Sequence, residues 1–169
     1  MIRAVIPSRP QTAPVADEPR VVEAVAFRAT GPMSVFGGPD DTGVTPSEGL
    51  ALWEPLEIAS APPGLFLDNQ PKGTSGLARR LNPDANYIAC RWNYHELEAR
   101  HGLTRAKLRH VPVLVRALHP KPGKPEHLYC WAVDWGPNVR TRRVADLSPG
   151  SARRLGLRTD DAVSVSIIV

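Results

Sequence analysis

The pattern of hydrophobic and polar positions is most regular at the C-terminal end of the chain. Residues 129–133 are apolar and rich in β-forming types, which predicts a strand. A Gly-Pro dipeptide at 136–137 predicts a turn shortly after this strand. Residues 163–169 alternate apolar with small polar side chains, and this period of two predicts a strand that closes the chain.

Between these strands the sequence predicts a short helix over residues 149–155. Ser148 supplies the hydroxyl typical of a helix N-cap, and Pro149 takes the first helical position, where its missing N–H is tolerated. Gly156 stands where a glycine usually ends a helix. The C-terminal quarter is therefore predicted to run strand, loop, short strand, helix, turn and strand.

The rest of the chain predicts more strand than helix. Strands are expected at 21–28, 87–92, 111–118 and 128–134. A proline-rich turn joins the last two into a hairpin. Residues 31–45 are predicted as a glycine-rich loop and residues 58–76 as a polar connection. Residues 94–110 have helical character that breaks at Gly102, and Thr104 is expected to cap a second short turn.

This order of elements resembles the rare lipoprotein A (RlpA) type of double-psi β-barrel, a family related to the expansins and barwin. The family's closing motif combines Asp-x-Gly-Pro, Arg-x-x-Asp-Leu-Ser, Leu-Gly and a Val-x-Val strand. Here the motif occupies residues 134–137, 143–148, 155–156 and 163–165. Trp135 stands where the family usually has an arginine, and weaker similarity reaches back to about Ser34.

The resemblance implies a mainly β fold: a six-stranded double-psi β-barrel with one or two short helices. It assigns residues 20–169 to the barrel domain. Residues 1–19 precede it as an extended, proline-rich arm. The arm holds four prolines and little apolar periodicity, a composition that forms no core of its own.

The same resemblance implies an open groove with an acidic floor. Sugar-cleaving relatives use an aspartate as general acid at the position of Asp134, and Asp146 flanks the same loop on its other side. Glu48 is a candidate for a further acid of the groove, and Asp41 could assist. A carboxyl group can act as a general acid when burial or a neighbouring like charge raises its pKa.

Each candidate also has a purely structural interpretation. Asp146 precedes a helix and could accept backbone N–H groups, and Asp134 could brace its loop or pair with an arginine. Glu48 could be an ordinary surface acid. Three tryptophans could either stack on sugar rings or fill the core: Trp53, Trp92 and Trp135.

The cysteines and histidines show no pattern of a metal site. Cys90 and Cys130 lie in separate predicted strands and could be joined in a disulfide or remain as buried free thiols. The chain has no Cys-x-x-Cys, and its five histidines lack the spacing of ligands. No nucleotide-binding motif is present, so no cofactor is expected.

Charge is divided between the two halves of the chain. Residues 1–75 carry five basic and nine acidic groups, a net charge of −4, and residues 76–169 carry 16 basic and eight acidic groups, a net charge of +8. The basic half could face an anionic polymer or form a solvated, arginine-rich surface. The arginines are not interleaved with stacking aromatics and no DNA-reading motif is present, so nucleic acid is not expected as a partner.

No apolar run is long enough to span a membrane, and residues 1–19 lack the apolar centre of a signal peptide. Typical RlpA proteins are exported. The sequence therefore suggests a virion component or a cytoplasmically made protein, or a periplasmic one whose signal has been removed.

Two functions follow from these features. The favoured one is a non-catalytic structural subunit of a larger assembly, such as a bacteriophage virion or tail, that could meet the cell wall. In this interpretation the arm tethers it to other protein subunits through Arg3, Pro7, Arg9 and Pro10. The alternative is a lytic transglycosylase that cleaves peptidoglycan, or a peptidoglycan-binding module, of RlpA type. The barrel motif favours the alternative. The arm favours the structural subunit, and so does residue 52, near which lytic relatives carry a histidine and this chain has none.

Overall fold

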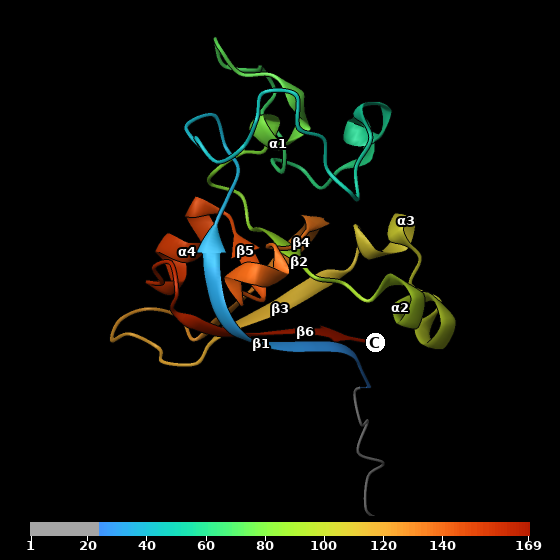
Figure 1. The fold of residues 1–169 in the computed structure, drawn as a ribbon, viewed down its shortest axis with the longest axis vertical. Helices are drawn as coiled ribbons and strands as arrows, with labels where there is room; N and C mark the ends of the chain where they lie inside the picture. Colours follow the sequence, from blue (N-terminus) through green and yellow to red (C-terminus); the bar gives the residue numbers. More distant parts are fainter. Residues whose placement is uncertain (1–23) are drawn as a thin grey trace, which may run out of the picture.

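The computed structural model describes residues 24–169, in which six strands close into a barrel (Figure 1). The strands are β1 (Val25–Val35), β2 (Tyr87–Cys90), β3 (Pro112–Ala117), β4 (His127–Trp135), β5 (Ala145–Leu147) and β6 (Ala162–Ile168). Around the barrel their order is β1-β5-β2-β4-β3-β6. The prediction of a mainly β fold built on a six-stranded barrel is confirmed.

The barrel contains two parallel strand pairs among four antiparallel ones. β1 runs parallel to β5 and β2 runs parallel to β4, whereas every other neighbouring pair is antiparallel. Exchanging the first three strands with the last three leaves both the order and the directions unchanged. The topology is therefore twofold symmetric, although the sequence contains no repeat.

The helices are short and lie outside the barrel wall. They are α1 (Gly76–Arg80), α2 (Tyr94–His101), α3 (Arg105–Leu108) and α4 (Pro149–Leu155), with 3-10 turns η1 (Pro55–Ser60) and η2 (Val139–Thr141). The predicted break at Gly102 is confirmed, and Thr104 caps α3 by accepting the backbone N–H of Lys107. α4 begins and ends as predicted, because Ser148 caps it and Gly156 takes the left-handed conformation.

β1 is longer than the sequence predicts. We expected a strand over 21–28 and a loop from residue 31, but β1 continues to Val35. Its first part pairs with β6 and its last three residues pair with β5. These partners lie far away in the sequence and supply the backbone hydrogen bonds that the local glycine-rich composition does not predict. The sequence also did not predict helix α1, which begins at Gly76, the last residue of the segment predicted as a polar connection.

The connection between β1 and β2, residues 36–86, covers one end of the barrel, and we call it the cap. In Figure 1 it is the cyan-to-green region above the strands. Its own small core includes Trp53 and Phe66, whose rings meet edge to face at 5.7 Å. The backbone N–H of Leu52 donates to the carbonyl of Val133 in β4, and Glu57 forms an ion pair with Arg109. The cap is thus fixed to the barrel at several points.

The barrel interior holds both cysteines. Cys90 and Cys130 are buried and free, which settles the alternative left open by the sequence. Cys90 is in register with Trp135, five residues further along β4 than Cys130. At about 3.3 Å of rise per residue, this register separates the two thiols too widely for a disulfide.

None of the helices within residues 24–169 has the length and apolar character that crossing a membrane requires.

Candidate functional site

A groove of about 460 Å³ opens where β1, β4 and β5 meet the cap. Its walls come from the end of β1, the loop after β4, and the start of the cap. Four carboxylates line it: Asp41, Glu48, Asp134 and Asp146. The structure therefore brings together the three acids that the sequence singled out, along with Asp41, from three separate segments: the start of the cap, β4 and β5.

β2 sets the spacing of the two aspartates. Ala89 pairs with Asp134 of β4 on one side and with Asp146 of β5 on the other. The register between β2 and β4 shifts by one residue at this point, so that Val133 has no partner in β2. Such a bulge re-aims the following side chain. Because Ala132 and Val133 are both buried, it is the bulge that allows Asp134 to line the groove.

Asp134 is anchored through one carboxylate oxygen. Its Oδ1 accepts the backbone N–H of Ala51 at 2.7 Å and that of Trp135 at 2.8 Å. Within the described part of the chain, Oδ2 accepts no hydrogen bond. Burial raises the pKa of Asp134 above its ordinary value of 3.8, the two backbone hydrogen bonds oppose this, and the nearby charges of Glu48 and Asp146 add to it. Asp134 thus has one fixed oxygen and one free oxygen in an acid-favouring environment.

Asp146 has a different hydrogen-bond partner. Its Oδ1 accepts the hydroxyl of Ser34, the residue opposite it on parallel strand β1. Burial raises the pKa of Asp146, the Ser34 hydroxyl and the charge of Arg143 lower it, and Asp41 raises it. Arg143 itself is held by Asp160 through two hydrogen bonds, at 2.8 and 3.2 Å. Ser34 was not among the predicted site residues, because only the β1–β5 pairing places it beside Asp146.

The other two acids are tied to the local backbone. Asp41 accepts the N–H of Gly37 at 2.6 Å and that of Gly43 at 2.8 Å, one with each oxygen. Glu48 accepts the N–H of Thr45 at 3.2 Å. These contacts shape the loop that forms one wall of the groove. Asp41 and Glu48 therefore contribute negative charge to the groove while stabilising its wall.

The tryptophans separate into core and surface. Trp53 and Trp92 are 1% and 2% exposed, so both take the core position that the sequence left open as the alternative, and neither offers a free face to a sugar ring. Trp92 instead donates its indole N–H to the carbonyl of Asp134 at 2.9 Å. Trp135 is 51% exposed and lines the groove. Of the three predicted platforms, Trp135 alone has an accessible face.

Trp135 is supported by two residues that were not predicted to belong to the site. Its ring lies against Tyr94 of α2, with the centroids 5.7 Å apart. The guanidinium of Arg105 lies over the Tyr94 ring at 4.4 Å. This stack orders the exposed indole at the mouth of the groove. The stack depends on contacts between α2, α3 and β4, which no local sequence motif predicts.

The structure leaves the predicted tether untested and shows no metal site among the residues that it describes. Arg3, Pro7, Arg9 and Pro10 are outside the described residues, so the tether stays a prediction. Among the residues that the structure describes, no histidine lines the groove. Within residues 24–169 no group of three or more acidic, histidine or cysteine side chains is arranged to hold a metal ion.

Comparisons of the sequence with known proteins assign no family. No model of a protein family matches the chain, and no curated protein is significantly similar to it.

Proposed function

We propose that the chain is an RlpA-like double-psi barrel whose acidic groove binds glycan strands and cleaves them as a peptidoglycan lytic transglycosylase. The observation that carries this proposal is the pair Asp134 and Asp146. Both are partly buried at the floor of an open groove, both have raised pKa values, and an exposed tryptophan stands beside them. A glycosidase acid requires such a shielded carboxyl group.

The barrel topology supports the family part of the proposal. Two parallel strand pairs related by a twofold exchange of the chain halves are compatible with a double-psi barrel. The Asp-x-Gly-Pro motif ends β4 and starts the loop that leads to β5. The Asp-Leu-Ser motif covers the end of β5 and the N-cap residue of α4, Ser148. The sequence motif and the strand order thus both support the resemblance.

In the proposed reaction Asp134 acts as the acid. Its free Oδ2 carries a proton to the glycosidic oxygen, and the bond from this oxygen to the anomeric carbon breaks with its electron pair on the leaving oxygen. The 6-hydroxyl of the same sugar then attacks the anomeric carbon and closes an anhydro ring. The hydroxyl proton returns to the Asp134 carboxylate, so no water is consumed. Trp135 offers a flat apolar face for a sugar ring beside the bond.

A second candidate is the structural subunit of a larger assembly, such as a bacteriophage particle. It is favoured by the way Asp134 binds the cap, because a carboxylate that accepts two backbone N–H groups can act as a brace alone. It also accounts for a groove without the histidine of the lytic relatives. In that case the groove would be a surface for a wall polymer or for another subunit.

One experiment separates these functions. Purified protein is incubated with peptidoglycan sacculi, and both soluble anhydro-muropeptides and co-sedimented protein are measured. Release of anhydro products supports the transglycosylase. Co-sedimentation without release supports a wall-binding module. If the protein neither releases products nor co-sediments, only the structural subunit remains.

A further inference from the structure

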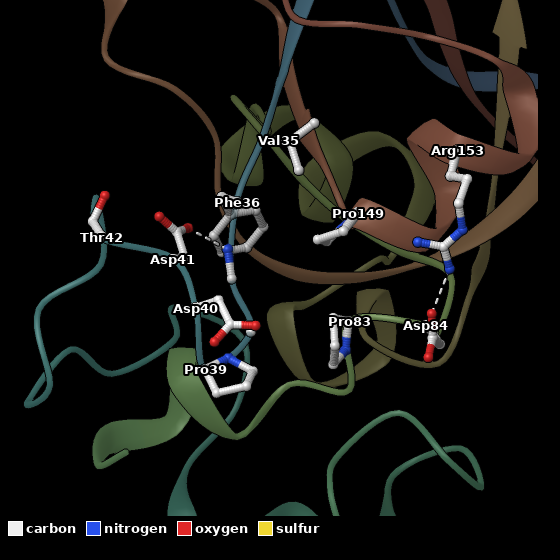
Figure 2. A pocket seen from close by; sticks show the side chains of 12 residues that line it. Val35, Phe36, Pro39, Asp40, Asp41, Thr42, Pro83, Asp84, Pro149 and Arg153 are labelled. Atoms are coloured by element: carbon white, nitrogen blue, oxygen red, sulfur yellow. Dashed lines mark hydrogen bonds and ion pairs between the residues drawn. The ribbon is translucent and has the colours of Figure 1, made fainter. Parts of the chain in front are cut away.

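A second hollow, of about 510 Å³, adjoins the acidic groove (Figure 2). It lies between the first residues of the cap, the Pro83-Asp84 turn and the start of α4. Val35, Phe36 and Asp41 line both hollows. The two are therefore neighbouring parts of one surface depression, with Asp41 between them.

The walls of this second hollow are amphipathic. The side chains of Phe36, Pro39, Pro83 and Pro149 supply apolar surface, as Figure 2 shows. Asp40 and Arg153 add a carboxylate and a guanidinium, and Arg153 forms an exposed ion pair with Asp84. A pyranose ring has apolar C–H faces and a rim of hydroxyl groups. Proline and aromatic faces suit the first, and charged hydrogen-bonding groups suit the second.

The hollow is built from a fixed loop. Asp41 holds the backbone N–H groups of Gly37 and Gly43, and the Tyr87 hydroxyl donates to the carbonyl of Phe36 at 2.9 Å. Gly38 has a φ of +82°, and a Cβ there would lie 3.2 Å from the ring of Pro83. Glycine is thus the residue that both fits this conformation and leaves the hollow open. A preformed site loses less conformational entropy when a ligand binds.

We propose that this hollow is a second glycan subsite, which continues the acidic groove past Asp41 and makes the substrate a linear polymer spanning both. The inference rests on the proposed function, because it assigns the same strand to both hollows. The second subsite defines the path of the glycan strand across the molecule. One part lies by Trp135, the bond to be cleaved lies over Asp134 and Asp146, and the rest lies against the prolines.

The test compares short and long glycans. Peptide-free peptidoglycan oligomers of one and of three disaccharide repeats are titrated calorimetrically into protein carrying Asp134→Asn, so that the strand is not cleaved. The longer oligomer is expected to bind at least about tenfold more tightly, since about 1.4 kcal/mol of added contact corresponds to a factor of ten. Adding Asp40→Ala and Arg153→Ala should remove most of this gain and leave the short oligomer's affinity unchanged. Asp68→Ala with Arg100→Ala, a pair of the same charge outside both hollows, is the matched control.

Amide chemical shifts give an independent measurement. Only the longer oligomer should perturb the amides of Asp40, Asp84 and Gly150. If the short oligomer binds but length adds no affinity, or if the extra perturbations fall elsewhere, the second subsite is wrong and the proposed function stands. If neither oligomer binds, both the subsite and the proposed function are wrong.

Discussion

Asp134 and Asp146 are the partners of one residue, Ala89, which pairs with Asp134 on one side and with Asp146 on the other. Because neighbouring strands lie about 4.8 Å apart, the Cα atoms of the two aspartates are roughly 10 Å apart. Residues directly opposite one another in a sheet project from the same face. Ala89 itself is buried, so the side chain between the two partners is small and apolar. This relationship makes the pair a unit that one strand positions.

The first prediction concerns Asp134. Both of its backbone donors bind Oδ1, so Asp134→Asn keeps the geometry and replaces only the free oxygen that would carry the proton. Release of anhydro-muropeptides should fall by about 10²–10⁴-fold, the range for a lost general acid. Thermal unfolding should change little. Asp68→Asn, an exposed aspartate away from the groove, should retain full activity.

Asp134→Ala provides the complementary case. It removes the acceptor of two backbone N–H groups, which is expected to destabilise the protein by about 1–3 kcal/mol. Urea unfolding measures this difference. Equal stability of the alanine and asparagine variants would show that Asp134 does not brace the cap.

The second prediction concerns the pH dependence set by Asp146. Its pKa in the folded protein lies above the ordinary value of 3.8, so the folded state binds this proton more tightly than the unfolded state. The contribution of Asp146 to the unfolding free energy should therefore decrease as the pH rises from about 3.8 through the raised pKa. Asp146→Asn should remove this part of the pH dependence, which urea unfolding at a series of pH values would detect.

Ser34→Ala should extend the same effect. The Ser34 hydroxyl donates to the carboxylate and lowers its pKa, so the loss of the hydroxyl raises the pKa of Asp146 further. Carbon NMR of the Asp146 carboxyl group should show its titration at higher pH than in the wild type. A midpoint that stays in place, or that moves down, would contradict the assigned contact.

The sequence predicted the features that depend on neighbouring residues. Ser148 and Gly156 define the two ends of α4 through contacts within a few residues. An N-cap serine and a C-terminal glycine can both be recognised directly in the sequence. The features it missed depend on distant partners. Continuation of β1 to Val35 requires β5, and the bulge at Val133 appears only when β2 lies alongside β4.

The candidate site shows the same division. The closing motif pointed to Asp134 and Asp146, and the structure places both in one groove. Composition could not show that Trp92 faces the core while Trp135 faces solvent. The face toward which a side chain projects at the end of a strand depends on how that strand pairs with its neighbours. Ser34 and Tyr94 were missed for a similar reason. Each has its relevance only through a residue far away in the sequence.

The third prediction compares two tryptophans. Trp135→Ala removes an exposed ring and should reduce co-sedimentation with sacculi by about two- to tenfold, since a stacked aromatic contact contributes about 0.5–1.5 kcal/mol. Because this ring is 51% exposed, its loss should change the stability little. Trp53→Ala removes a buried ring from the cap and should lower the unfolding free energy by about 3–5 kcal/mol. Sedimentation and chemical unfolding are measured for both. Full wall binding by Trp135→Ala would argue against its role as a platform.

The fourth prediction concerns Gly136, where the loop after β4 crosses the end of β2. A Cβ at Gly136 would lie 2.6 Å from the backbone N of Arg91 and 2.6 Å from the carbonyl carbon of Cys90. Both are main-chain atoms of the barrel, so neither can rotate away. Gly136→Ala must push β2 and the loop apart, and we expect it to destabilise the protein by about 2–3 kcal/mol.

Gly49→Ala is the matched control for this substitution. A Cβ at Gly49 would meet no atom within 4 Å, and the φ of Gly49 is not left-handed, so alanine there should be neutral or stabilise by about 0.4–1 kcal/mol. The two variants differ in the space around one added methyl group. Because Gly136 follows Asp134 and Trp135 directly, its displacement should also weaken binding to sacculi, whereas Gly49→Ala should bind normally. If Gly136→Ala were as stable as the wild type, the close crossing of loop and strand would be wrong, and with it the placement of Asp134 beside Ala89.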